Sequence, residues 1–96
     1  MTKALLCAAI FLAFSSTVYA DCQRPSAPDI PDPNSAVTAQ MVKAQKDVKA
    51  FIAEAEIYLK CVRRSTDHNE MVDEMETVAN HFNQTIRAYK QRMGDV

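Results

Sequence analysis

Two long stretches of this chain carry apolar residues at helical spacing, and this pattern limits the fold more than any other feature. In the first stretch, residues 38–64, apolar side chains recur every seven residues, and a further apolar residue stands three positions after each of the first three. Such a stripe over more than three heptads is typical of an amphipathic helix or a coiled coil. Its members are Met41, Ala44, Val48, Phe51, Ala55, Tyr58 and Val62, with Ile52 and Leu59 alongside.

The ends of this first helix are marked by residue types that suit helix termini. Thr38, or Ser35 a turn earlier, carries a hydroxyl that can accept a hydrogen bond from the first backbone amides. Arg63 and Arg64 suit a C-terminus, where the helix dipole favours positive charge. We therefore expect a helix over residues 38–64.

A second stripe covers residues 67–93, where acidic residues crowd the first half and basic residues the end, as the helix dipole favours. Asp67 and Glu70 resemble a capping box, and Gly94 is placed to end the helix. Because a short connection makes successive helices antiparallel and no alternating strand pattern occurs, the sequence predicts an all-α, two-helix hairpin. The second stripe contains Met71, Met75, Val78, Phe82, Ile86, Tyr89 and Met93.

The first twenty residues are typical of a secretory signal peptide. Lys3 precedes an apolar run from Ala4 to Phe14, and Val18-Tyr19-Ala20 provides a cleavage site after residue 20. The apolar run is shorter than the ~20 residues of a spanning helix. A lipoprotein would need a small residue before Cys22, where Asp21 stands. We therefore expect a protein exported to the periplasm or the medium, with no transmembrane segment once the leader is removed.

Removal of the leader takes Cys7 with it and leaves two cysteines, Cys22 and Cys61. An even number in an exported chain indicates a disulfide, and no C-x-x-C motif suggests a reactive thiol pair. The disulfide would close a loop of about 40 residues, which the chain-entropy model values at roughly 4 kcal/mol. A mature chain this short has a thin core, so such a crosslink is comparable with its whole stability.

Residues 21–37 form a proline-rich extended segment. Pro25, Pro28 and Pro31 recur every third residue, which places their rings on one face of a polyproline II helix. A flexible linker is the alternative. About 40 Å of such a segment matches about 35 Å of the first helix, so the chain can turn near residues 33–35 and run back along that helix.

This arrangement makes a geometric prediction about the first helix. Ile57 and Cys61 lie on a flank outside the apolar stripe, and a segment laid along that flank would cover Ile57 and bring Cys22 to Cys61. The proline rings would then face three helix residues. These are Ile57, Tyr58 and Phe51.

Residues 22–62 resemble the pancreatic-polypeptide hairpin, in which a proline-repeat strand packs on an amphipathic helix; the likeness implies a packing mode. The mature chain is also similar to short, uncharacterised exported proteins of Gram-negative bacteria, a likeness that implies location and fold. The matching pieces are Cys22-x-Arg24-Pro25-x-x-Pro28, residues 41–51, Cys61 after Tyr58-Leu59-Lys60, and residues 79–89.

Several kinds of chemistry find no support in the sequence. A formal net charge of −1 lacks the basic excess of a nucleic-acid binder, and a single glycine excludes glycine-rich phosphate loops. His68 and His81 have no partners at metal-ligand spacing. Carboxylates sit on solvated faces, without the burial that acid–base catalysis needs. We therefore expect no catalytic, cofactor-binding or metal-binding residues, and no enzyme.

Six basic residues should gather at one end of an antiparallel hairpin and could bind an anionic partner such as a lipid headgroup or an acidic protein. The sequence favours the simpler interpretation, a solvated face without function that nearby aspartates partly neutralise. The sequence favours a non-enzymatic binding or structural module of the cell envelope, with pairing to a second copy as another option. The alternative function is thiol–disulfide redox chemistry at Cys22 and Cys61. The basic residues are Lys43, Lys46, Lys49, Arg87, Lys90 and Arg92.

Overall fold

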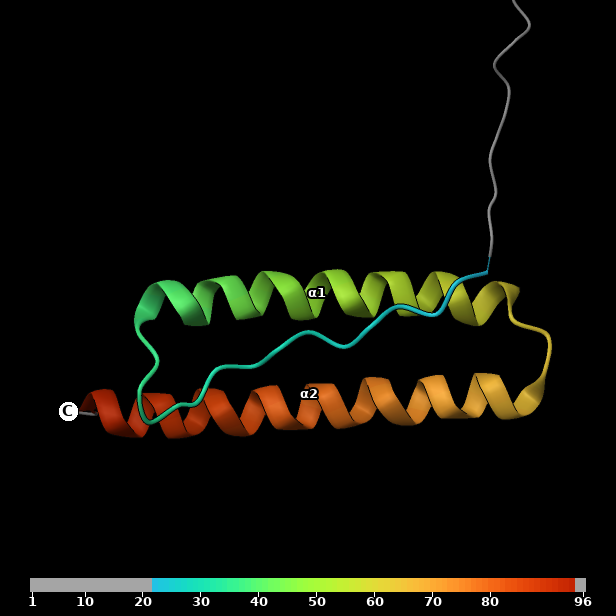
Figure 1. Ribbon diagram of the computed structural model, residues 1–96. Helices are drawn as coiled ribbons and strands as arrows, with labels where there is room; N and C mark the ends of the chain where they lie inside the picture. Colours follow the sequence, from blue (N-terminus) through green and yellow to red (C-terminus); the bar gives the residue numbers. More distant parts are fainter. Residues whose placement is uncertain (1–21, 95–96) are drawn as a thin grey trace, which may run out of the picture.

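The computed structural model describes residues 22–94, which form two antiparallel helices and one extended segment (Figure 1). Helix α1 spans Thr38–Cys61 and helix α2 spans Ser65–Gly94. Residues 22–94 contain no strand, so this part of the chain is the all-α hairpin that the two stripes predict. The predicted leader, residues 1–20, lies outside the described residues.

Helix α1 begins at the expected residue, but the prediction of its cap is wrong. Val37 is the N-cap, and the side-chain Oε1 of Gln40 accepts a hydrogen bond from the Val37 amide at 2.9 Å. The Thr38 hydroxyl is instead hydrogen-bonded to the Tyr89 hydroxyl of α2 at 2.7 Å. Ser35 lies in the turn before the helix. The Thr38 hydroxyl therefore makes a contact with α2 instead of capping its own helix.

The connection between the helices is shifted by a few residues from the expected one. Val62 takes an extended conformation, with ψ at 143°, so α1 ends at Cys61 and before Arg64. Helix α2 starts two residues earlier than expected, at Ser65. Asp67 is therefore inside the first turn rather than at the cap, and it accepts a hydrogen bond from Arg64 Nε at 3.0 Å. The positive φ of Gly94, 113°, ends α2 as predicted.

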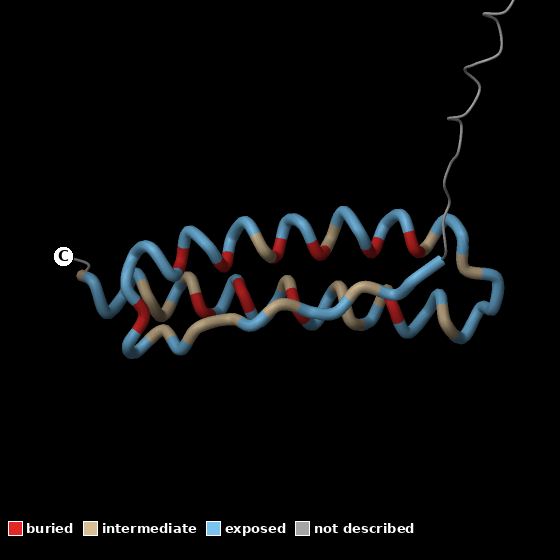
Figure 2. The backbone as a smooth tube through the Cα atoms, turned by 45° about the horizontal axis from the view of Figure 1, so that its top comes forward, coloured by how far each residue is buried: buried red, intermediate tan, exposed pale blue. Residues whose placement is uncertain are grey.

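The two apolar stripes face each other and form the core, whose buried residues line the facing sides of the helices (Figure 2). Thr85 is also buried, at 3% exposure, because it continues the spacing of Val78 and Phe82. Met93 was expected in the core but is 53% exposed. It lies one turn beyond Tyr89, which is level with the first residue of α1, so no part of α1 covers it. The core comprises Ala36, Met41, Ala44, Val48, Phe51, Ala55, Tyr58, Met71, Val78 and Phe82.

Residues 22–34 cross one face of the hairpin, from the end of α1 to the end of α2 (Figures 1 and 2). Pro25, Pro28 and Pro31 are half-buried whereas the residues between the first two are exposed, which is the three-residue period of a polyproline II helix. Ile30 is also half-buried and packs against the core. The segment thus adds a partial third layer to two helices.

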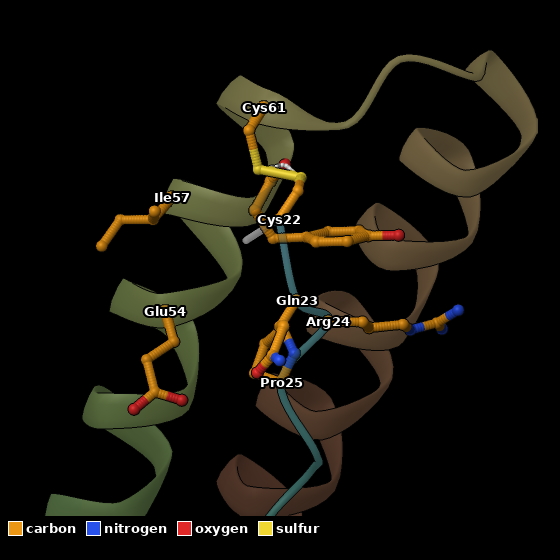
Figure 3. A pocket seen from close by; sticks show the side chains of 8 residues that line it. Cys22, Gln23, Arg24, Pro25, Glu54, Ile57 and Cys61 are labelled. Carbon is orange, nitrogen blue, oxygen red and sulfur yellow. Dashed lines mark hydrogen bonds between the residues drawn. A yellow bond between two sulfur atoms is a disulfide. The ribbon is translucent and has the colours of Figure 1, made fainter. Parts of the chain in front are cut away.

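The predicted position of this segment is wrong in one respect. It lies over the groove between α1 and α2, and not over the outer flank of α1 that carries Ile57. Ile57 is 65% exposed, and its side chain points away from the segment (Figure 3). Tyr58 and Phe51 are buried. Over the groove the segment reaches both helices, because Ile30 lies beside α1 and Arg24 is hydrogen-bonded to Glu74 of α2.

Candidate functional site

A disulfide joins Cys22 to Cys61, as predicted, with 5.7 Å between their Cα atoms. It fastens the start of the extended segment to the last residue of α1. Both cysteines are exposed, and together with Pro25 and Ile57 they line a shallow pocket of about 360 Å³ (Figure 3). A dithiol in solution can therefore approach this bond.

Arg24 fastens the same end of the segment to α2. Its Nη2 donates a hydrogen bond to Glu74 at 2.8 Å, and its Nη1 donates one to Glu70 at 3.3 Å. The hydrogen bond to Glu74 is the main cause that raises the pKa of Arg24 above its ordinary value. Helical periodicity does not say which helix the segment approaches, so this role of Arg24 could not be predicted from the sequence.

Arg92 holds the other end of the segment, at the turn before α1. The turn closes with hydrogen bonds from the Ser35 and Ala36 amides to the Asp32 carbonyl at 3.1 and 2.9 Å. Arg92 Nε donates to the Pro33 carbonyl at 2.8 Å, and its Nη2 donates to the Ala36 carbonyl. Residues 22–94 contain no strand that could donate backbone hydrogen bonds to these two carbonyls, and the Arg92 side chain donates them instead.

The Arg92 guanidinium also lies 5.6 Å from the centroid of the Tyr89 ring, a cation–π contact. The Tyr89 hydroxyl is hydrogen-bonded to Thr38. Contacts therefore connect the turn to the start of α1 and the end of α2.

The six basic residues predicted to form one patch do not share one role. Lys43 is paired with Asp47 at 2.6 Å, and this hydrogen bond raises the pKa of Lys43, to which Asp29 of the segment adds. Arg92 is engaged with the turn. The other four are exposed, and no ion pair joins them to another side chain within residues 22–94. They are Lys46, Lys49, Arg87 and Lys90.

The face of the hairpin opposite the extended segment carries a second groove, which we call the open groove. It has a volume of about 300 Å³ and is lined mostly by apolar side chains of both helices, with Lys90 at its edge. Val42, 46% exposed, is its most accessible apolar residue on α1. Nothing in the sequence distinguished this groove from the core. The open groove is lined by Thr38, Met41, Val42, Gln45, Phe82, Ile86, Tyr89 and Lys90.

Residues 22–94 hold no cluster of three or more histidine, cysteine, aspartate or glutamate side chains arranged for a metal ion. His68 and His81 are exposed. Neither described helix is long and apolar enough to cross a membrane. No protein-family model, curated protein or solved structure matches this chain.

Proposed function

We propose that the protein is a small exported binding module of the cell envelope, which acts through its surface and performs no catalysis. The observation that carries this proposal is the open groove. One face of the hairpin is covered by the chain's own segment, whereas the other exposes an apolar groove with Val42 and Lys90 at its edges. Exposed apolar grooves with polar rims are typical of interaction sites.

The export part of the proposal rests on the leader-like residues 1–20 and on the disulfide. A disulfide that is exposed to solvent persists in oxidising compartments and is rare in the cytosol.

Site-specific photo-crosslinking tests the binding function. A photoreactive amino acid placed at Val42 should give discrete adducts in cells that produce the protein. The same amino acid at Ile57, which is exposed on the outer flank of α1, is the matched control and should give none. Absence of adducts from Val42 and from a second position at Gln45, which is exposed and also lines the open groove, would contradict a binding role for this face.

Redox activity is the second candidate, and the exposure of both Cys22 and Cys61 favours it. A dithiol reductant would open the disulfide to two thiols and become oxidised itself. Alkylation of thiols in intact cells separates the two functions. A structural crosslink should be found fully oxidised, whereas a redox-active pair should show a reduced fraction that changes with growth conditions.

A further inference from the structure

Along the axis of the hairpin, the open groove lies at the same position as Ile30, which packs against the core from the covered face. On the covered face, Ile30 and Pro31 lie against α1 residues between Gln40 and Asp47. On the opposite face, the open groove begins at Thr38 and extends to Gln45 of the same helix. The hairpin therefore has a groove on each face at this level. Its own segment lies over one of them, where Ile30 packs against the core.

The charges of the hairpin differ between the two faces. On the covered face, Lys43 is paired with Asp47 and also lies near Asp29 of the segment. At the open groove, Lys90 forms part of the wall, and Lys46 and Lys49 lie one helical turn beyond its lining residues Val42 and Gln45.

No acidic residue occurs in residues 38–46 of α1 or in residues 77–94 of α2, which form this end of the hairpin. The only carboxylate of α1 close by, that of Asp47, lines the groove on the covered face. The open groove is therefore apolar with a basic border, and it complements a ligand that is apolar and acidic.

We propose that the open groove binds an extended segment of another protein in which a bulky aliphatic residue and a proline follow an acidic residue, as in Asp29-Ile30-Pro31. The aliphatic side chain would pack in the groove against Met41 and Phe82, as Ile30 packs against the core on the covered face, and the acidic residue would lie beside Lys90. This inference rests on the proposed function and names the chemistry of its partner.

The source of the segment is a different protein and not a second copy of this chain. Each copy holds its own Asp29–Pro31 between two fastenings, the disulfide at Cys22 and the Arg92 hydrogen bonds at the turn. Donation to another copy would require both to open.

A synthetic peptide with the sequence of residues 27–34 serves as the probe. Titration of the fluorescently labelled peptide with the oxidised protein, followed by fluorescence anisotropy, should give saturable binding. Replacement of the isoleucine in the peptide by serine should weaken it about tenfold, which corresponds to roughly 1.4 kcal/mol. Protein variants Val42→Glu and Lys90→Glu should each weaken it about as much. The matched controls Ile57→Glu and Lys60→Glu change exposed residues away from the groove and should leave it unchanged.

Three outcomes would overturn the inference. The first is no saturable binding, or equal binding of the serine peptide. The second is binding weakened by Lys43→Glu but not by Lys90→Glu, which would place the peptide on the covered face. The third is self-association of the protein that Val42→Glu abolishes, which would make a second copy the occupant. Adducts from Val42 in cells without peptide binding would refute the segment chemistry and leave the binding function standing.

Discussion

Among single side chains, that of Arg92 joins the end of α2 to the turn before α1. It donates to two turn carbonyls and lies over the Tyr89 ring. Arg92→Ala should lower the free energy of unfolding by about 1.5–3 kcal/mol, because two hydrogen bonds from a charged donor to backbone carbonyls are lost. Urea denaturation measures this change.

The matched control for Arg92 is Arg87→Ala, an exposed position on the same helix where a change within about 0.5 kcal/mol is expected. Equal effects of the two substitutions would mean that the contacts of Arg92 with the turn contribute nothing specific.

Met71 is the most completely buried large side chain, at 0% exposure. Met71→Ala removes apolar contacts and leaves a cavity, so it should destabilise the protein by about 2–5 kcal/mol. Met93→Ala, at the exposed end of the same helix, should have little effect in the same urea titration. A small loss for Met71→Ala would show that the core collapses readily around the missing side chain.

At the scale of elements, the disulfide determines how firmly the extended segment is held. Reduction should release residues 22–34 first and lower stability by roughly 4 kcal/mol. Hydrogen exchange and limited proteolysis should then detect new exposure at residues 25–34, while α2 stays protected longer. The reductant should have no further effect on the Cys22→Ser/Cys61→Ser variant. Unchanged proteolysis of this segment after reduction would contradict its dependence on the disulfide.

The sequence predicted the elements well, because each has a strong period. The seven-residue stripes gave both helices, and the three-residue proline spacing gave the buried side of the extended segment. It failed at the lateral position of that segment. A helical stripe shows which side of α1 is apolar, but the choice between the groove and the outer flank near Ile57 depends on contacts with α2, such as that of Arg24 with Glu74.

The helix ends were the other failure at this scale, and for a related reason. Thr38 is a good capping residue, yet its hydroxyl is bonded to Tyr89 across the hairpin. Capping rules consider only the helix that a residue belongs to, and here a contact with the other helix replaces the expected cap. The six basic residues show the same limit: helix directions place them at one end, but the contacts of Lys43 and Arg92 divide them.

At the scale of the whole molecule, we expect the oxidised protein to be a monomer. The extended segment covers one face of the hairpin, and the open groove is bordered by positive charge in every copy, which opposes face-to-face pairing at that end. Light scattering after size-exclusion chromatography at several concentrations tests this. A stable dimer would show that the hairpin leaves more apolar surface than one copy can cover.

The mature chain should begin at Asp21. Loss of the leader removes Lys3 and leaves ten basic against twelve acidic residues, a formal charge of −2. Mass spectrometry of the intact protein, recovered from the cell envelope or the medium, should give the mass of residues 21–96 less two hydrogens for the disulfide. Recovery of an uncleaved chain with reduced cysteines from the cytosol would contradict export.

The Cys22–Cys61 bond also determines how the molecule would bear mechanical tension. A pull applied between Cys22 and Gly94 passes through the disulfide directly to Cys61, and from there along residues 62–94. The extended segment and α1 form a closed covalent ring outside this load path. Stretching the oxidised protein should therefore separate and extend α2, while the ring of residues 22–61 stays closed. Only in the reduced protein can all of residues 22–94 be extended.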